Sequence, residues 1–297
     1  MTGRVRSLVS RSTPGHYTDR ESVSGWAMLT AVDPRISSPF DAAAASYDAD
    51  FSDTVAGRTM RGLVWERLEG LFTEGQRLVE LGCGTGEDAV WLAGRGVRVA
   101  ATDRSSAMLE RASAKADRAR VADRISFSFL DLDAIDTADA PEATPFDGAL
   151  ANFGVLNCLA DRRPLARRLA EWLRPGAVVV VVVMGRWCLL ELLGFAVKLE
   201  PRRALRRLRD GRKVGTGGGG TVATWYPGWR LLRREFGEHF VVRERRAVGL
   251  AVPPPDFEDW LKERPERVAG LLRWERRLAP LFPGLGDHTM LVLERRS

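Results

Sequence analysis

A glycine-rich segment, residues 78–88, carries the residue types most suited to binding a nucleotide-like ligand. It reads Leu-Val-Glu-Leu-Gly-Cys-Gly-Thr-Gly-Glu-Asp, so a short apolar run leads into Gly82, Gly84 and Gly86. Glycine permits the sharp backbone bends of such a turn and lets the main chain approach a ligand closely. A strand, a turn of this kind and a helix form the place where doubly wound α/β folds bind nucleotides.

The glycine spacing and the neighbouring acids distinguish between ligands. Dinucleotide-binding turns have the spacing G-x-G-x-x-G and hold a pyrophosphate at the helix N-terminus. Here the spacing is G-x-G-x-G, and Glu87 and Asp88 follow it. Two carboxylates at a helix start would repel a pyrophosphate, whereas a sulfonium cofactor with an ammonium group carries no phosphate. With Glu80 before the turn, these acids predict a site for a cationic ligand.

Two further acids follow later apolar runs. Asp103 comes directly after the run 97–102, where a carboxylate can accept hydrogen bonds from both hydroxyls of a ribose or can cap the next helix. Asp131 follows the run 125–130, where it can accept a hydrogen bond from an adenine amino group or serve a structural role. Both positions are candidates for nucleoside binding.

Alternating strands and helices are needed to bring these residues together. Strands are expected at 78–81, 97–102, 125–130, 148–151 and 178–184, and helices at 54–72, 88–92, 105–115 and 162–173. Later candidates are strands at 240–242, extending toward 252, and at 289–293, with one helix over 257–278 between them. This alternation predicts an α/β fold with a doubly wound, mostly parallel sheet.

Taken together, the motifs resemble the class I, Rossmann-like methyltransferases that use S-adenosylmethionine. The Glu-Leu-Gly-Cys-Gly-Thr-Gly run is among the more specific signals of that family, and the segments 99–112, 146–157 and 173–182 fall where the family has its later motifs. The resemblance covers about residues 41–295 and implies a seven-stranded sheet and S-adenosyl-L-methionine as the cofactor. The cofactor-binding residues that it implies are Tyr47, Glu80, Gly82, Cys83, Gly84, Gly86, Asp103, Arg104, Met108, Asp131, Leu132, Asn152 and Phe153.

The chain is expected to be one methyltransferase domain, residues 39–297, after a mobile tail at 1–38 that lacks periodicity. Met28 is an alternative start within that tail. An insertion follows the fifth strand at about 186–220. It is expected to form a lid, because it begins at the edge of the sheet where such folds bind ligands, and its Gly215–Gly220 segment could act as a hinge.

Composition narrows the possible partners. Three cysteines and three histidines without metal-ligand spacing disfavour a disulfide framework or a metal site and fit a reducing cytoplasm. No apolar run approaches the roughly 20 residues of a membrane span, so no membrane partner is expected. Eight basic residues and two acids lie between Lys198 and Lys213, giving +6, which equals the net charge of the whole chain. That run is interpreted as a solvated helix face or a local site for an acidic or carrier-tethered substrate, and a general nucleic-acid surface is disfavoured.

The sequence indicates less about the identity of the methyl acceptor than about that of the cofactor. A small molecule, such as a natural-product intermediate, is favoured. The candidates for contact with it are Asn157, Arg186, Glu191, Tyr226 and Trp229, and no catalytic base is assigned. Alternatives are a non-methylating enzyme that uses the same cofactor for cyclisation or decarboxylation, a protein or RNA methyltransferase, and a cofactor-binding module without turnover.

Overall fold

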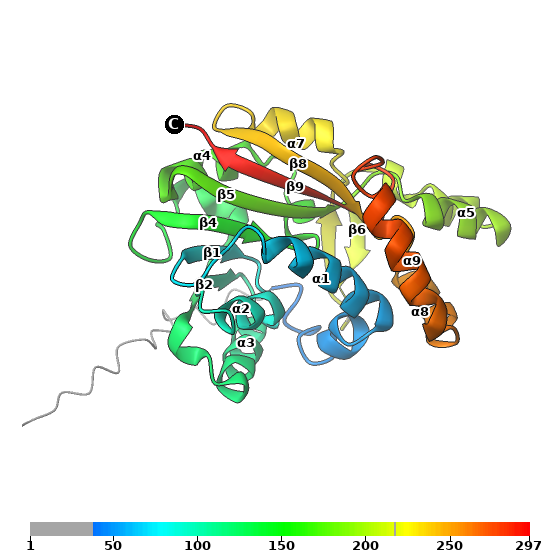
Figure 1. Ribbon diagram of the computed structural model, residues 1–297, viewed down its shortest axis with the longest axis horizontal. Coiled ribbons are helices and arrows are strands. Elements are labelled where there is room, and N and C mark those ends of the chain that lie inside the picture. Colours follow the sequence, from blue (N-terminus) through cyan, green and yellow to red (C-terminus); the bar gives the residue numbers. More distant parts are fainter. Residues whose placement is uncertain (1–37, 217) are drawn as a thin grey trace, which may run out of the picture.

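The computed structural model describes residues 38–216 and 218–297, so nearly all of the predicted tail lies outside the described residues. Its centre is a seven-stranded sheet with the strand order β3-β2-β1-β4-β5-β9-β8 (Figure 1). The strands are β1 (Arg77–Leu81), β2 (Arg98–Asp103), β3 (Ile125–Phe129), β4 (Phe146–Ala151), β5 (Leu173–Met184), β8 (Phe240–Val248) and β9 (His288–Arg295). The first five pair in parallel, and β9 is antiparallel to both β5 and β8. The predicted fold class is confirmed.

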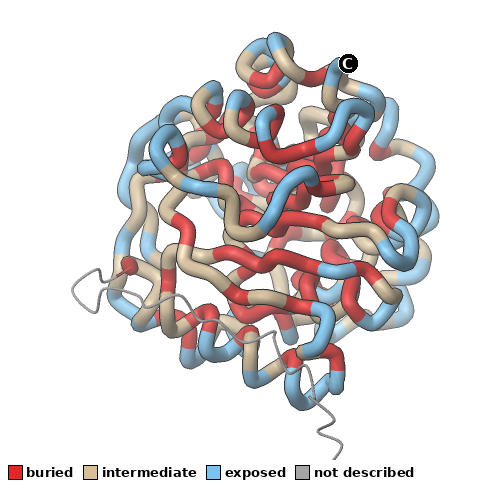
Figure 2. Tube along the Cα trace, turned by 90° about the vertical axis from the view of Figure 1, so that its left-hand side faces the viewer, coloured by how far each residue is buried: buried red, intermediate tan, exposed pale blue. Residues whose placement is uncertain are grey.

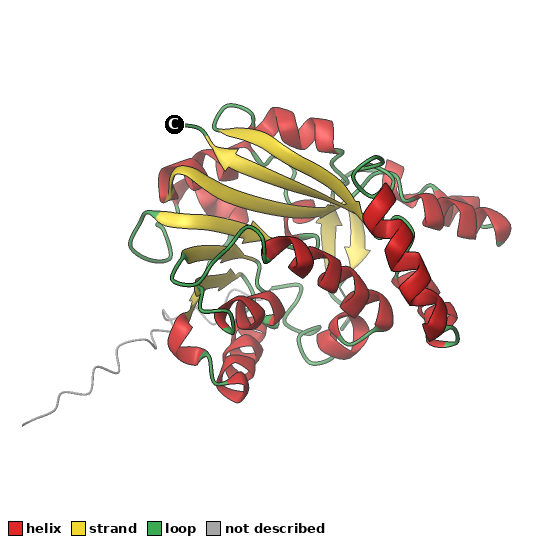
Figure 3. Cartoon of the chain, viewed as in Figure 1, coloured by secondary structure: helices red, strands yellow, loops and turns green. Residues whose placement is uncertain are grey.

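Helices cover both faces of this sheet (Figure 3). One face packs against α1 (Val55–Leu68), α2 (Glu87–Ala93) and α3 (Ser106–Ala119), and the other against α4 (Arg163–Trp172) and α7 (Trp229–Phe236). Along β5, Val180 and Val182 belong to the first core and Val179, Val181 and Val183 to the second. Because both faces are buried there, residues 178–183 of β5 are all valine instead of alternating with polar residues. Figure 2 shows the buried residues gathered along the sheet.

The insertion between β5 and α7 contains more structure than the sequence indicated. It consists of α5 (Leu189–Val197), α6 (Pro201–Ala204), and a two-stranded hairpin of β6 (Arg212–Gly215) and β7 (Thr221–Thr224). The expected solvated helix face over 198–213 is therefore wrong, because that run is divided among α6, a 3-10 turn, a loop and β6. Short helical turns complete the described chain at η1 (Asp48–Ser52), η2 (Ala122–Arg124), η3 (Leu132–Thr137), η4 (Val155–Cys158), η5 (Arg206–Leu208) and η6 (Pro255–Phe257).

The helix expected over 257–278 is two helices, α8 (Glu258–Lys262) and α9 (Pro265–Leu278). Arg264 between them has φ −137° and ψ 53°, which is not helical. Proline has no N–H to continue the helix, and its ring disfavours the helical conformation in the preceding residue. The apolar periodicity runs across this break, which explains why the sequence pattern alone suggested one helix.

Candidate functional site

A pocket lies at the edge of the sheet where the parallel strands end. Its lining comes from the turn after β1, the ends of β2, β3 and β4, the segment before α1, and the β6–β7 hairpin. Every cofactor candidate from the sequence lines this pocket except Glu80 and Gly86. The structure thus brings together residues from six separate segments at the place that the topology of the fold favours for a ligand.

Each of the three positions in the turn after β1 requires glycine for a different physical reason. All three have positive φ angles: 65° at Gly82, 53° at Gly84 and 83° at Gly86. A Cβ on Gly82 would lie 2.5 Å from Cγ2 of Val155, and a Cβ on Gly86 would lie 2.8 Å from the Cβ of Ala112, so packing excludes larger residues at both. A Cβ on Gly84 would meet nothing within 4 Å and would enter the pocket. Gly84 therefore leaves open the space that a ligand needs beside the main chain.

Asp103, at the end of β2, is held by the backbone on both carboxylate oxygens. Its Oδ2 accepts the N–H of Gly84 at 2.9 Å, and its Oδ1 accepts the N–H of Ser105 at 2.9 Å. Burial raises the pKa of Asp103, and the backbone N–H groups of Ser105 and Gly84 oppose that effect. Each carboxylate oxygen has more than one acceptor site, so a positioned acceptor remains on each oxygen for two neighbouring hydroxyl groups.

The acids that follow Gly86 are already paired with bases. Lys115 forms ion pairs with Glu87 and, at 2.8 Å, with Asp48. Asp88 accepts from Nη1 of Arg61 at 2.5 Å, and the indole of Trp65 and the amide of Asn152 also donate to it. The attraction of Glu87 and Asp88 for a cationic ligand therefore stays a prediction, and these contacts, which the local sequence does not reveal, offset part of their negative charge.

Glu80 lies beneath the pocket and does not line it. Its side chain is buried, and Oε2 has no hydrogen-bond partner among the described residues. Burial, followed by the charge of Asp88, raises the pKa of Glu80 well above its ordinary value. Glu80 is not among the lining residues of the pocket, so its contact with the cofactor stays a prediction.

The opposite side of the pocket, here called the hairpin wall, comes from two segments far apart in the sequence. Phe40 and Tyr47 precede α1, and Val214, Thr216 and Val222 belong to the hairpin or its turn. The side-chain oxygen of Thr216 donates to the carbonyl of Pro39 at 2.7 Å, which joins the two segments. The sequence predicted only Tyr47 among these residues.

The glycines at the hairpin tip serve close packing. A Cβ on Gly220 would overlap the carbonyl oxygen of Pro39, and a Cβ on Gly218 would lie 2.5 Å from the backbone of Ala42. The glycine run was interpreted from the sequence as a hinge. The contacts show a packing role, since Gly218 and Gly220 let the chain at residues 39–42 lie directly against the hairpin, and the hinge stays a prediction.

Asn157, in η4, lines the pocket and joins the end of the hairpin to the sheet through hydrogen bonds. Its side-chain amide donates to the carbonyls of Met184 at 3.0 Å and Trp225 at 2.6 Å, and its Oδ1 accepts the N–H of Met184. The other four acceptor candidates, Arg186, Glu191, Tyr226 and Trp229, do not line this pocket. Arg186 pairs with Asp210, and Glu191 and Tyr226 lie buried near Arg207.

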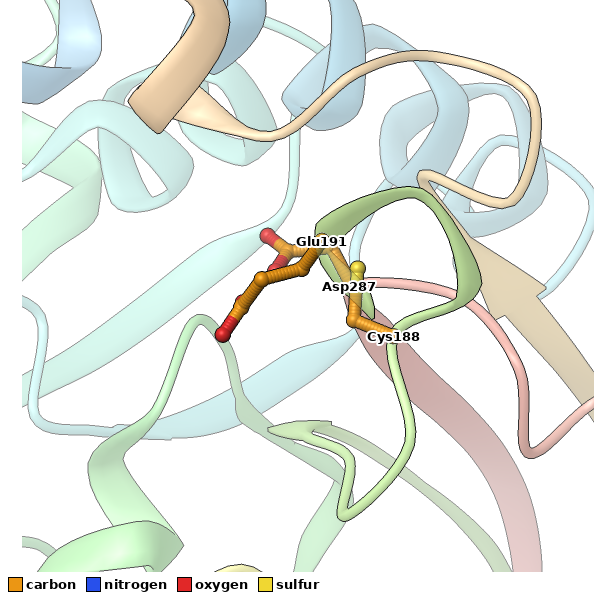
Figure 4. Close-up of side chains that lie close together, drawn as sticks. All are labelled: Cys188, Glu191 and Asp287. Atoms are coloured by element: carbon orange, nitrogen blue, oxygen red, sulfur yellow. The ribbon is translucent and has the colours of Figure 1, made fainter. Parts of the chain in front are cut away.

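Arg207 joins the insertion to the end of the sheet through buried charges. It forms ion pairs with Glu191 at 2.5 Å and with Asp287, and its Nη1 donates to the carbonyl of Asp287 at 2.8 Å. Figure 4 shows Cys188, Glu191 and Asp287 close together, as a metal site would require. The guanidinium of Arg207 supplies the positive charge to both carboxylates, so the cluster is an ion-pair network that anchors the insertion.

Two residues that line the pocket, Phe40 and Arg61, were not predicted from the sequence. Phe40 precedes the first helix in a segment without periodicity. Arg61 lies in α1, and its guanidinium carbon is 4.9 Å from the ring centre of Phe153. Arg61 is 7% exposed, and the burial of an arginine on a helix could not be read from the residue type. No local signal marked either residue.

Comparison with known proteins agrees with this architecture. Residues 79–179 match a family model described as a methyltransferase domain. The chain is 31% identical over 144 residues to the tRNA 5-carboxymethoxyuridine methyltransferase of Escherichia coli (strain K12), covering 47% of this chain and 54% of the relative. It is 35% identical over 133 residues to the 27-O-demethylrifamycin SV methyltransferase of Amycolatopsis mediterranei (strain S699), covering 44% of this chain and 46% of the relative. The chain thus spans about half the length of the curated relatives it matches.

A solved structure extends the likeness to most of the fold. The putative methyltransferase in a complex with the Haloferax volcanii Trm112 methyltransferase activator superposes with a TM-score of 0.54 and 19% identity. The match covers 87% of this chain and 98% of that one. The match over residues 79–179 and the shared fold support the class I, S-adenosylmethionine-dependent methyltransferase family that the sequence motifs predicted.

Proposed function

We propose that the protein transfers a methyl group from S-adenosylmethionine to a small-molecule acceptor. The observation that carries this proposal is the arrangement of Gly84 and Asp103. One leaves open space beside the main chain, and the other presents positioned carboxylate oxygens to that space. A ribose with two free hydroxyls and no phosphate nearby is the ligand chemistry that suits this pair.

The remaining pocket residues suit the other parts of this cofactor. Asp131 and Leu132, with Arg104 and Met108 on the neighbouring segment, would hold the adenine, as the family resemblance implies. Arg61 lines the pocket, and its buried Nε has no hydrogen-bond partner among the described residues. The methionine carboxylate of the cofactor is an acceptor that would satisfy this donor. The residues present therefore fit the cofactor.

The chain's own contribution to the reaction is positioning and the exclusion of water. When bound, the cofactor supplies a methyl group that its positive sulfur has already activated. The protein must then hold the acceptor in line and keep water out. The apolar side chains of Val214, Val222 and Met184, which line the pocket, suit that task.

The hairpin, rather than the whole of residues 186–220, is proposed as the cover of the pocket. Residues of β6, β7 and their turn line the pocket, whereas none of α5 or α6 does. Limited proteolysis between 212 and 224 tests the cover, with and without S-adenosylhomocysteine. We expect faster cutting in the free protein. Equal cutting rates would show that the hairpin is fixed structure.

A small-molecule acceptor is supported by the apolar lining of the hairpin wall and by relatives named for natural products, such as the rifamycin enzyme. The tRNA enzyme among the relatives makes RNA the alternative acceptor. Incubation with methyl-labelled S-adenosylmethionine and fractionated extract, followed by mass spectrometry, distinguishes them. Label in low-molecular-mass products supports the proposal, whereas label confined to RNA or protein contradicts it.

The three unpaired cysteines fit a proposed location in a reducing cytoplasm.

Cofactor binding has its own test. Isothermal titration calorimetry should show binding of S-adenosylmethionine and S-adenosylhomocysteine and no binding of NAD. Tight NAD binding without binding of S-adenosylhomocysteine would overturn the proposed function.

A further inference from the structure

Helix α5 is apolar around almost its whole circumference. Its sequence is Leu-Leu-Glu-Leu-Leu-Gly-Phe-Ala-Val, and its one charged residue, Glu191, is buried in ion pairs with Arg206 and Arg207. A helix with no polar face is normally enclosed by other parts of a protein or by lipid. This helix instead lies at the right-hand edge of Figure 1, beyond the end of the sheet.

One side of α5 is packed against the rest of the protein. A Cβ on Gly194 would overlap the ring of Phe257, so the helix lies directly on η6 at this point. The rings of Phe195 and Phe257 have centres 5.6 Å apart. Together with the buried Glu191, these contacts account for the inner face of the helix.

The outer face has no partner among the described residues. Leu189, Leu193 and Val197 recur at the spacing of one helical stripe, and their exposed fractions are 38%, 55% and 84%. Leu199, in the turn after the helix, is 86% exposed and has a φ of 55°, which is unusual for leucine. Trp187, before the helix, is 44% exposed. The apolar stripe therefore runs along the helix that projects at the right-hand edge of Figure 1.

Basic residues without acidic partners accompany this stripe. Lys198 lies between Val197 and Leu199, and Arg202 follows in α6; both are exposed, and the described residues provide no ion pair for either. Arg209, Arg212 and Lys213 share these properties farther along the insertion. The Lys198 ammonium lies 4.8 Å from the ring centre of Phe257. The combination is thus an apolar stripe with positive charges that no acidic side chain among the described residues pairs with.

We propose that α5 and the turn after it form a peripheral docking site for an anionic phospholipid surface. The apolar side chains would enter the boundary between headgroups and acyl chains, and the basic residues would contact lipid phosphates, as in interfacial helices. A second copy of this chain would bring the same positive charges against each other. A projecting helix that carries both apolar and basic side chains fits a lipid interface better than it fits contact with a second copy of this chain. The sequence-based expectation of no membrane partner considered only membrane-spanning segments, and no described helix is long and apolar enough to cross a membrane. Binding to a membrane surface requires only one exposed apolar face.

Vesicle co-sedimentation of the full chain tests this inference. The protein should bind vesicles containing phosphatidylglycerol, bind much less to phosphatidylcholine alone, and lose binding as salt rises. The double substitution Leu193→Glu with Val197→Glu should reduce binding by about tenfold or more, because it removes the inserted apolar surface. Arg202→Gln should reduce it by about fivefold, the size of one basic contact to an anionic surface.

Matched controls lie on α3, away from α5 in Figure 1. Ala119→Glu and Arg118→Gln change exposed residues in the same chemical ways and should leave vesicle binding unchanged. Thermal unfolding should be the same for all variants, since every substituted side chain is exposed. The inference is overturned if the wild type does not bind anionic vesicles, or if the double variant binds as tightly as the wild type. It is also overturned if light scattering shows a dimer that the double substitution dissociates. None of these outcomes depends on methyl transfer.

Discussion

The two sides of the pocket are built by different means. The strand-end wall, made by the turns and loops that follow β1 to β4, depends on short sequence motifs in which a strand, a glycine turn and a helix follow one another. The hairpin wall depends on contacts between segments that lie far apart in the chain, such as Thr216 with Pro39 and Asn157 with Trp225. The two walls therefore differ in how the sequence specifies them, although they face the same space.

That difference has functional consequences for the proposed reaction. The strand-end wall offers backbone groups and carboxylates suited to a cofactor that is shared across the family. The hairpin wall offers mostly apolar side chains, which come partly from the insertion and partly from the segment before α1. Substitutions in the first wall should weaken cofactor binding strongly, whereas substitutions that disturb the second should weaken it less and should also change the fit of the acceptor.

The largest effect is expected where the insertion is anchored. Arg207→Met should lower the free energy of unfolding by about 3–5 kcal/mol, because it leaves the buried carboxylates of Glu191 and Asp287 without their positive partner. Urea denaturation measures the loss. The control is Arg209→Met, at an exposed position, where a change within about 0.5 kcal/mol is expected. Similar stability of both variants would mean that the network does not anchor the insertion.

The same network predicts a dependence of stability on pH. Burial alone would raise the pKa of Asp287, but the charges of His288 and Arg207 more than offset it, so its pKa lies below the usual value. An acid whose folded pKa is depressed stabilises the protein above its unfolded pKa of about 3.9 and loses that contribution as pH falls further. Urea denaturation below about pH 4 should therefore narrow the stability gap between the wild type and Arg207→Met. A gap that stays constant or widens on acidification would contradict this assignment.

In the strand-end wall, Asp103→Ala should weaken the binding of S-adenosylhomocysteine by roughly 1.5–3 kcal/mol, the scale of hydrogen bonds to a charged group. That corresponds to an affinity loss of about ten- to a hundredfold in titration calorimetry. Folding should survive, because the residue lies at a strand end. Asp117→Ala, on the exposed side of α3, is the control and should bind like the wild type. An unchanged dissociation constant for Asp103→Ala would remove this residue from the site.

The smallest effect is expected at the hairpin tip. In Gly220→Ala, the new methyl group would overlap the carbonyl of Pro39, so the segment carrying Phe40 and Tyr47 must move away from the hairpin. We expect about a fivefold loss in affinity for S-adenosylhomocysteine, or about 1 kcal/mol. Gly228→Ala is a matched control, because a Cβ there meets nothing within 4 Å. Equal affinities in the two variants would show that the contact does not shape the pocket.

The parallel sheet and the cofactor side of the pocket were predictable from the sequence because their signals are local. Apolar runs of strand length marked β1 to β5, and the helical pattern over 54–72 marked α1, which the structure begins at Val55. Asp103 and Asp131 could be placed together because the carboxyl ends of parallel strands meet at one edge of a sheet. Each of these inferences needed only a short stretch of chain and a general rule of α/β folds.

Tertiary structure alone decided the pairing of charges and the other side of the pocket. Lys115 pairs with Glu87, and Arg61 pairs with Asp88, although neither base is adjacent to its acid in the sequence. The insertion was predicted in position but not in form, so Glu191 was expected near the acceptor and is instead held by Arg207 away from the pocket. Residue type and spacing specify local backbone geometry. The partner of a long charged side chain, and the segment that covers a pocket, depend on which distant parts of the chain the folded sheet brings within a few ångströms.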